Sequence, residues 1–492
     1  MKSKIIAAIS AVATAFLFFS FAGSGEVTIS PETQECIDCH SSITPGIVSD
    51  WETGLHSKIT PAAAKTNPAL ARRISSAVIP ETHLDVVVGC YECHSLNAGK
   101  HQDNFEHFGY NINIVVSPDD CATCHEVEVE QYHHSKKGYA VDNLRKNSLY
   151  SLLVGTYTDL KTLDASGNLH CFRSEQSENE SCYACHGTEV TVAGLKTIDT
   201  DLGEIDVPNL LNWPNMGVGR INPDGSRGAC TSCHPRHSFS IEIARKPSTC
   251  GQCHLEPDVP AYNVYKESKH GTIYDNFEKK MNFSSVPWVA GKDFTAPTCA
   301  TCHNSLITDA DNNIIAERTH DFGSRLWVRI FGLPYAHPQP VKGSTYEILN
   351  AENQPLPTTF AHVPASGFLI DEKEMENRKN IMGKVCKSCH GTSWVNAHFT
   401  NLDSTVFNTN LMTETATGLV SLAWKNKMAD PANPFDEPIE QLWVKSWLLY
   451  SNSIRHATAM SGPDYAGFKN GWYDLSNTLQ QMHSIVHKRK KR

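Results

Sequence analysis

The pattern Cys-x-x-Cys-His occurs eight times in this chain of 492 residues and uses sixteen of its seventeen cysteines. Two cysteines three positions apart can present both sulfurs to the two vinyl groups on one edge of a haem, and the following histidine then reaches the iron as an axial ligand. Disulfides, thioredoxin-like sites and zinc sites do not require a histidine after every second cysteine. The pattern therefore predicts eight covalently bound c-type haems.

The haem-attaching and proximal residues follow directly from the motif. The predicted attachment sites are Cys36, Cys39, Cys90, Cys93, Cys121, Cys124, Cys182, Cys185, Cys230, Cys233, Cys250, Cys253, Cys299, Cys302, Cys386 and Cys389. The predicted proximal iron ligands are His40, His94, His125, His186, His234, His254, His303 and His390. Cys171 lies outside the pattern, and we expect an unpaired thiol there.

Sixteen of the 24 histidines lie outside the motifs and are candidates for the second axial position. A haem that only transfers electrons usually takes a second histidine, whereas a catalytic haem leaves that face open. Eight histidines would close every iron, so the count alone does not reveal an open one. From their positions beside haem-bearing segments we expect seven distal ligands, with His134 preferred over its neighbour His133: His56, His83, His107, His134, His237, His320 and His398.

The elements that must position these ligands are expected to be mainly α-helical. Motif starts lie 20 to 87 residues apart, which is too irregular for a tandem repeat and too short for one domain per haem. We therefore expect a multihaem cytochrome c fold in which the haems form much of the core. Short strands are indicated only near 314–315 and 328–331.

The character of the chain changes after the last motif. No cysteine follows it, and helical spacing of apolar residues recurs at 420–427, 437–452 and 474–487. We expect a haem-rich domain over residues 25–370. Residues 371–492 would form a region that carries the eighth motif and long helices.

The first residues resemble a secretory signal. Lys2 and Lys4 precede an apolar run at 5–22 and small residues at 23–25, which predicts a signal peptide over residues 1–24, with an uncleaved membrane anchor as the alternative. The protein is then expected in the periplasm or an equivalent extracytoplasmic compartment. A net charge of -10 argues against nucleic acid as a partner, although the basic end at 487–492 runs against the overall sign.

The order of the eight motifs, the long helical C-terminal region and the stretch "GPDYAGFKNGWYDL" (462–475) together resemble the octahaem hydroxylamine oxidoreductases. The resemblance covers nearly the whole mature chain. It implies a homotrimer in which the haem of the fourth motif, held by His186, is catalytic and open. In oxidising members a tyrosine of the neighbouring subunit bonds covalently to that haem, and Tyr465 stands where we expect it.

The resemblance also implies proton-transferring groups beside the catalytic haem. Oxidising members place an Asp-His pair there, and by its distance from Tyr465 the candidate histidine is His270, which is alternatively a distal ligand. The residue before it is Lys269, and the chain contains no Asp-His dipeptide. A lysine beside the iron would favour an anion such as nitrite; a solvated surface lysine is the other interpretation.

These patterns predict an oxidoreductase that acts on small nitrogen compounds. The first expectation is oxidation of hydroxylamine or hydrazine at the fourth haem, with electrons leaving through seven bis-histidine haems to a redox partner cytochrome. The alternative is the same fold run reductively, as a nitrite or hydroxylamine reductase without the tyrosine cross-link. A third is a non-catalytic electron conduit in which every iron is closed.

Overall fold

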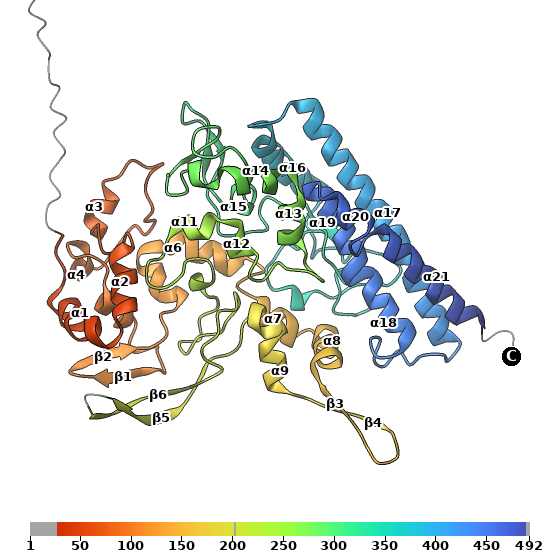
Figure 1. Ribbon diagram of the computed structural model, residues 1–492, viewed down its shortest axis with the longest axis horizontal. Coiled ribbons are helices and arrows are strands. Elements are labelled where there is room, and N and C mark those ends of the chain that lie inside the picture. Colours follow the sequence, from red (N-terminus) through yellow and green to blue (C-terminus); the bar gives the residue numbers. More distant parts are fainter. Residues whose placement is uncertain (1–26, 201–202, 489–492) are drawn as a thin grey trace, which may run out of the picture.

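The computed structural model describes residues 27–200 and 203–488, and within them the chain is mainly helical, as predicted (Figure 1). Each motif lies in or beside a helical turn, which brings residues three apart to the same side. Both thiols of a motif therefore point one way. The motif-bearing elements are α1 (Pro31–Ile43), α5 (Cys90–His94), α6 (Pro118–His134), α10 (Cys182–His186), η1 (Cys230–Ser232), α12 (Pro247–Cys250), α15 (Cys299–His303) and α16 (Glu372–Lys387).

Short helices and 3-10 turns connect the motif-bearing elements. Some helices of the chain begin with a hydroxyl cap followed by proline. At the start of α6, the Ser117 hydroxyl accepts a hydrogen bond from the Asp120 amide, and Pro118 is the first helical residue. The other helical elements of the haem-bearing part are α2 (Pro45–Thr53), α3 (Pro61–Lys65), α4 (Glu81–Leu84), α7 (Ala140–Arg145), α8 (Ser148–Thr158), α9 (Glu175–Glu180), α11 (Ile241–Arg245), α13 (Ala261–Glu267), α14 (Lys269–Phe277), η2 (Glu278–Lys280) and η3 (Thr345–Glu347).

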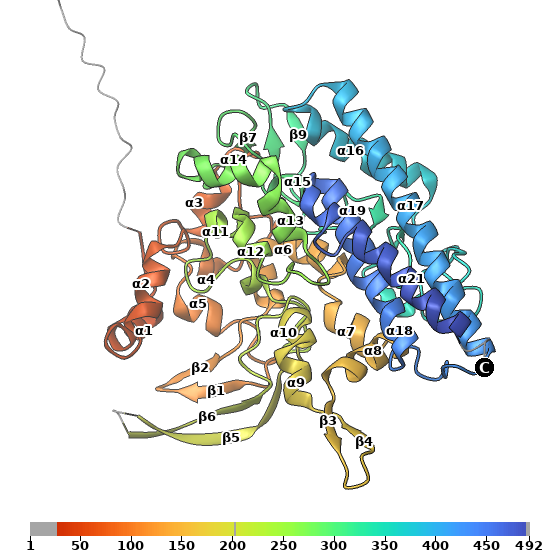
Figure 2. The ribbon, with the colours of Figure 1, turned by 45° about the vertical axis from the view of Figure 1, so that its right-hand side comes forward.

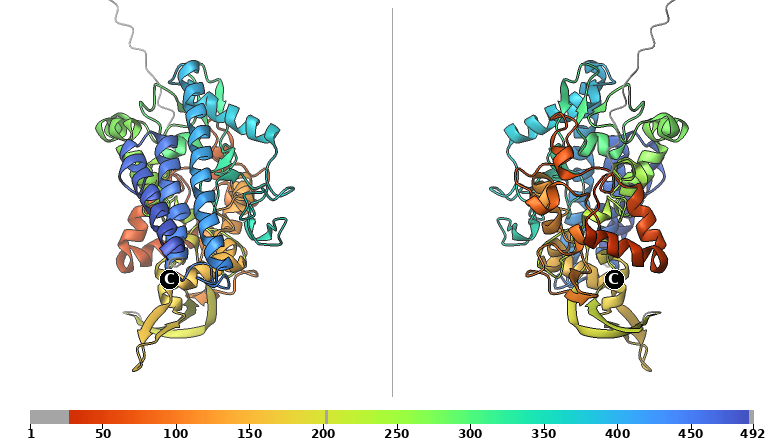
Figure 3. Two further views of the ribbon diagram at one scale, coloured as in Figure 1. Left: turned by 90° about the vertical axis from the view of Figure 1, so that its right-hand side faces the viewer. Right: turned by 90° about the vertical axis from the view of Figure 1, so that its left-hand side faces the viewer.

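Long helices follow the last motif, and all three predicted helical segments are confirmed within them. With 34 residues, α17 is about 51 Å long and runs beside α21 (Figure 3). Trp443, Trp447 and Phe435 are almost fully buried between these helices. The elements are α17 (Thr392–Lys425), α18 (Pro438–Val444), the π-helical segment η4 (Lys445–Tyr450), α19 (Ser451–Met460), α20 (Pro463–Gly467) and α21 (Trp472–Lys488).

A buried row of threonines on α17 fixes α19 in place. Thr409, Thr413 and Thr417 follow one another at intervals of four and therefore share one face of the helix. Thr409 accepts a hydrogen bond from the Arg455 guanidinium at 2.8 Å, and the hydroxyls of Thr413 and Ser451 lie 3.0 Å apart. This row holds the α19 segment that carries His456 against the haem-bearing part of the chain.

The strands form small ribbons, and three hairpins lie at the edge of the molecule (Figure 2). The two strands expected near 314–315 and 328–331 are confirmed as β9 and β10, while three hairpins were not foreseen from the sequence. The strands are β1 (Asn104–His107), β2 (Tyr110–Asn113), β3 (Leu160–Leu163), β4 (Leu169–Phe172), β5 (Thr191–Thr200), β6 (Gly203–Leu211), β7 (Trp288–Val289), β8 (Ile307–Thr308), β9 (Ile314–Ala316), β10 (Val328–Arg329) and β11 (His337–Pro338).

Two expectations about regions of the chain stay predictions. The proposed signal peptide, residues 1–24, lies outside the described residues. The division near residue 371 is likewise untested, although α16 begins at Glu372. In the described ranges no helix has both the length and the apolar character needed to cross a membrane.

Candidate haem sites

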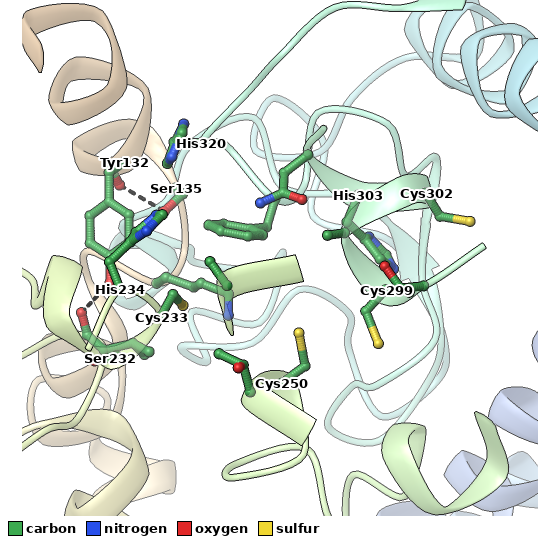
Figure 4. Close-up of a pocket in the computed structure, with 18 of the residues that line it drawn as sticks. Tyr132, Ser135, Ser232, Cys233, His234, Cys250, Cys299, Cys302, His303 and His320 are labelled. Atoms are coloured by element: carbon green, nitrogen blue, oxygen red, sulfur yellow. Dashed lines mark hydrogen bonds between the residues drawn. The ribbon is translucent and has the colours of Figure 1, made fainter. Parts of the chain in front are cut away.

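Thiols and imidazoles from seven of the eight motifs line one connected cavity of about 1750 Å³. In Figure 4 the thiols of Cys250 and Cys299 point into this space from different elements, and Cys299 lowers the pKa of Cys250. None of the seventeen cysteines forms a disulfide, and all of them belong to the described part of the chain. The shared interior predicted from the motif spacing is therefore a cavity lined by free thiols.

Three pairs of imidazoles face each other across a gap that suits one metal ion. A metal–nitrogen bond of about 2 Å on each side, plus roughly 1 Å from nitrogen to ring centre, would separate two axial imidazoles by about 6 Å. The ring centres of His40 and His107 are 6.3 Å apart, as are those of His56 and His125. The third pair, His270 and His390, is separated by 6.0 Å.

Three further histidines lie close enough to a motif histidine to interact with it electrostatically. Burial lowers the pKa of His237 to about 4, and the neighbouring His94 adds to this shift. Burial likewise lowers the pKa of His320 to about 4, with His234 the next contributor (Figure 4).

His456 is the third of these histidines, and it was left unassigned from the sequence. Burial lowers the pKa of His254 to about 3, and His456 is among the groups that deepen the shift. The Nδ1 atom of His456 lies 2.8 Å from the Asn452 carbonyl oxygen. A hydrogen bond there leaves Nε2 free, the arrangement typical of a metal-ligating histidine.

The other three expected distal ligands do not face a motif histidine directly. His83 lines the cavity, and its Nε2 is buried without a hydrogen-bond partner. His398 is separated from His390 by the Trp394 ring, which stacks on both. His134 is exposed, does not line the cavity, and has Nδ1 2.8 Å from the Glu130 carbonyl oxygen.

The fourth motif is held by a tightly packed glycine loop. His186 Nδ1 lies 3.2 Å from the Ala140 carbonyl oxygen, which orients the ring. A side chain on Gly219 would meet the Ala140 amide at 2.7 Å and the His186 carbonyl at 2.8 Å. Glycine is therefore required at this position for the loop to approach the motif.

The surroundings of His186 differ from those of the paired histidines. Burial lowers the pKa of His186, and the charged groups that act on it are Asp258 and Arg329. Across residues 27–200 and 203–488 no histidine from outside the motifs is found opposite His186. Both charged residues line the cavity, and Arg329 has no ion pair or side-chain hydrogen bond among the described residues.

Two cytochrome families match parts of the chain. The family described as "Seven times multi-haem cytochrome CxxCH" matches residues 223–323, and "Cytochrome c554 and c-prime" matches residues 120–206. A curated relative from Kuenenia stuttgartiensis, a probable nitrite reductase-hydroxylamine oxidoreductase fusion protein, is 23% identical over 344 residues. The match covers 60% of this chain but only 37% of that protein.

Solved structures extend the match to nearly the whole chain. A hypothetical multiheme protein is 43% identical, with a TM-score of 0.89, and the match covers 94% of this chain and 96% of that one. The chain is therefore a multihaem cytochrome. The reducing HAO-like protein complex of Kuenenia stuttgartiensis shares the fold at 17% identity, with a TM-score of 0.60 and coverage of 94% and 85%.

The residues of this multihaem cytochrome fit covalently bound c-type haem. The motif thiols are free, and the imidazole pairs leave room for an iron between them. When bound, haem supplies a redox-active iron that carries single electrons and, where one face is open, binds a small ligand. The chain's own contribution is to orient the imidazoles and to decide which face stays open.

Lys269 and His270 lie at the eighth motif. Both begin α14, and the His270 ring stands opposite His390. This position fits the alternative role given to His270, that of a distal ligand, at the eighth motif. Lys269 is exposed at the edge of the same site.

Tyr465 is buried inside its own chain. Its side chain packs against Val264 and Ala457, and its hydroxyl donates to Glu256 Oε2 at 2.7 Å. Burial, together with the hydrogen bond to Glu256, raises the pKa of Tyr465. The ring is not among the described residues that line the cavity. Tyr465 therefore packs within this subunit, whereas Phe468 and Tyr473 of the same segment are 79% and 65% exposed.

Thiols of different motifs lie close together, so the sites form a connected series. Cys36 and Cys90 influence each other's pKa, as do Cys121 and Cys230. The same holds for Cys185 with Cys253 and for Cys250 with Cys299. Neighbouring haems attached at these positions would lie near enough for electron transfer along the chain of sites.

Sequence reasoning missed Asp258 because it looked for an aspartate directly before a histidine and chose His270, which follows Lys269. Asp258 lies four residues after His254, in "CHLEPDVPAY", and is followed by Val259. A search for an acidic residue within a few positions of each motif would have found it. His456 had no local signal, because it is brought to His254 only by the packing of α19.

Proposed function

We propose that this chain is an octahaem c-type oxidoreductase that reduces small nitrogen compounds, with nitrite and hydroxylamine as the candidate substrates, at an open haem held by His186. The observation that carries the proposal is at the fourth motif, where the described ring contacts show no opposing imidazole and the cavity-lining groups Asp258 and Arg329 lie near enough to act on the pKa of His186. The names of the relatives, which include nitrite reductase and reducing proteins, support the same substrate class.

Arg329 is the group that would attract an anionic substrate. It lines the cavity near His186, and no carboxylate of the described residues lies within ion-pairing distance of it. Lys136 lies nearby and donates to Gln339 Oε1 at 2.8 Å. A guanidinium in a half-buried site binds an oxyanion such as nitrite through charge-assisted hydrogen bonds.

Asp258 is the group that would deliver protons. Converting nitrite to nitric oxide and water takes up two protons with one electron, and converting hydroxylamine to ammonia and water takes up two protons with two electrons. A carboxyl group beside the substrate can relay such protons from solvent. Val259 follows Asp258, so no imidazole assists from the next position.

The reductive direction is favoured over the oxidation first expected from the resemblance because of Tyr465. Cross-linking to a neighbouring subunit's haem requires a phenol that is accessible at the subunit surface. Here the side chain is 1% exposed and its hydroxyl is engaged by Glu256 of the same chain. We propose that the haem at the fourth motif is unmodified, and that the seven remaining haems carry two histidines each. A second histidine lies near six of those seven motif histidines, and for His303 of the seventh motif it is a proposal without such a neighbour.

Two measurements test this function. Carbon monoxide added to the reduced protein should bind one iron per chain, and no binding would instead support the electron conduit. A denaturing mass spectrum should give single chains carrying eight haems; covalently joined subunits would support hydroxylamine or hydrazine oxidation and overturn the reductive assignment.

We also propose export and a homotrimer. Export is supported by the charged and apolar pattern of residues 1–24, and trimers by the family resemblance. N-terminal sequencing of the purified protein would locate the cleavage site. Sedimentation equilibrium at low concentration would give the number of subunits, and a monomer would contradict the trimer.

A further inference from the structure

The first motif occupies an exposed end of the molecule. Figures 1 and 2 place α1, α2 and the β1–β2 hairpin together at one side, away from the long C-terminal helices. Cys39 is exposed, and neither Cys36 nor Cys39 lines the cavity shared by the other motifs. A haem attached there would have an edge close to solvent, with His40 and His107 on its two faces.

Exposed apolar side chains surround this site. Ile43 is 55% exposed one turn after His40, Ile47 on α2 is 42% exposed, and Phe108 is 63% exposed. The Phe108 ring centre lies 4.9 Å from that of His107. Apolar groups clustered around a reactive edge form the centre of a typical protein–protein contact.

Carboxylates outnumber the cations near the apolar residues, where Lys58 follows α2 and Arg236 lines a small pocket with Ile47 and Asp50. Residues 27–57 contain five acidic residues and no lysine or arginine, and β1 adds one more carboxylate. None of the six takes part in an ion pair in the described chain. They are Glu32, Glu35, Asp38, Asp50, Glu52 and Glu106.

The opposite end of the haem series has the opposite charge. Lys384 precedes the eighth motif, Lys387 lies inside it, and Lys269 begins the helix that carries its facing histidine. The negative charge of the first site is therefore a local feature, and it would create a directed field at that end alone.

We infer that the face formed by α1, α2 and the β1–β2 hairpin docks a small basic redox protein of the c-type cytochrome class, which exchanges electrons at the first haem. One electron passes between the partner's haem and this haem, and no bond is formed or broken. A second copy of the same face would bring like charges together, which disfavours self-association there. The inference rests on the proposed role as an oxidoreductase but holds for either direction of the reaction.

The test measures electron exchange by stopped flow between the reduced holoprotein and oxidised mitochondrial cytochrome c, a basic protein used as the probe. The variant E35Q/D38N/D50N should lower the second-order rate constant at low ionic strength by about tenfold, because steering depends on the opposed charges. The difference should vanish at high salt. A matched variant, E352Q/D311N/E376Q, removes three exposed carboxylates elsewhere and should react like the unmodified protein.

A second variant tests the apolar centre without changing charge. Phe108→Ser should weaken binding of the probe, measured by calorimetry at low salt, and the loss should persist as salt rises. Equal rates for both triple variants, or a rate that increases with salt, would overturn the inference. Salt-sensitive self-association that is lost in E35Q/D38N/D50N would also overturn it, since a second copy would then occupy the face.

Electron exchange with the probe does not require turnover of a nitrogen compound. If carbon monoxide does not bind at the fourth site, the proposed function is contradicted, while the docking result still holds. If nitrite reduction with an artificial electron donor is normal, and E35Q/D38N/D50N exchanges electrons with the probe at an unchanged rate, only the docking inference is contradicted.

Discussion

The fourth and eighth motifs use the same residues on one side and different residues on the other. His186 and His390 each end a Cys-x-x-Cys-His turn, yet the His390 ring lies 6.0 Å from that of His270, while the charged groups that act on the pKa of His186 are Asp258 and Arg329. An iron between two imidazoles is restricted to electron transfer. The motif therefore attaches the haem, and the residue across from it decides what the haem can do.

The largest effect on activity is expected from removing the Asp258 carboxylate at the fourth site. Asp258→Asn should lower the turnover number for nitrite by about 10²- to 10⁴-fold, because a general acid contributes a factor of this size. Steady-state rates with a chemically reduced dye as donor would measure it. Glu256→Gln is the matched control, since it lies two residues away and keeps an acceptor for the Tyr465 hydroxyl.

An unchanged turnover number in Asp258→Asn would show that protons reach the substrate by another route. A loss of the same size in the control variant would instead indicate that the segment had shifted. Absorption spectra of the ferric and ferrous protein would establish that all haems are still attached.

Removing the Arg329 cation should have a smaller effect, and it should affect a charged substrate more than a neutral one. A hydrogen bond to a charged group contributes about 1.5 to 3 kcal/mol, so Arg329→Gln should raise KM for nitrite by roughly 10- to 100-fold. Hydroxylamine is neutral at pH 7, and its KM should change much less. If Arg329 instead binds a haem propionate, both substrates would be affected alike and the potential of the fourth haem would shift.

Lys136 predicts a modest pH dependence at the fourth site. Burial lowers its pKa to about 8, and the nearby Arg329 lowers it further, whereas Asp321 opposes the shift. The lysine is therefore charged below pH 8 and neutral above it, so nitrite affinity should fall by about three- to fivefold as the pH rises through 8. Lys136→Gln should flatten this part of the KM profile, measured from pH 6.5 to 9.5; an unchanged profile would exclude the lysine.

The sequence could predict the attachment chemistry because the motif is local. A cysteine, its partner three positions on and the next histidine lie within one helical turn, so no tertiary information is needed. The C-terminal helices were predictable for the same reason, since their apolar spacing repeats along the chain. The hairpin β3–β4 was not, because Leu160, Leu163, Leu169 and Phe172 are all exposed and show no alternation.

The distal residues were harder to predict because they come from remote parts of the fold. His456 reaches the sixth motif from a helix some 200 residues later, and its position depends on the threonine row of α17. Tyr465 was placed by resemblance alone, and the Glu256 carboxylate that binds its hydroxyl comes from 209 residues away. Spacing along the chain carries no information about such contacts.

The eighth site can be converted to resemble the fourth. His270→Gly removes the facing imidazole and leaves a space beside His390, so carbon monoxide should bind two irons per reduced chain instead of one, as measured by titration at the Soret band. His398→Gly is the matched control, because Trp394 stands between that histidine and His390, and it should still bind one. If His398→Gly opened the iron and His270→Gly did not, the pairing at the eighth motif would be reversed. The difference between a closed and an open haem would then depend on the aromatic stack and not on the imidazole opposite.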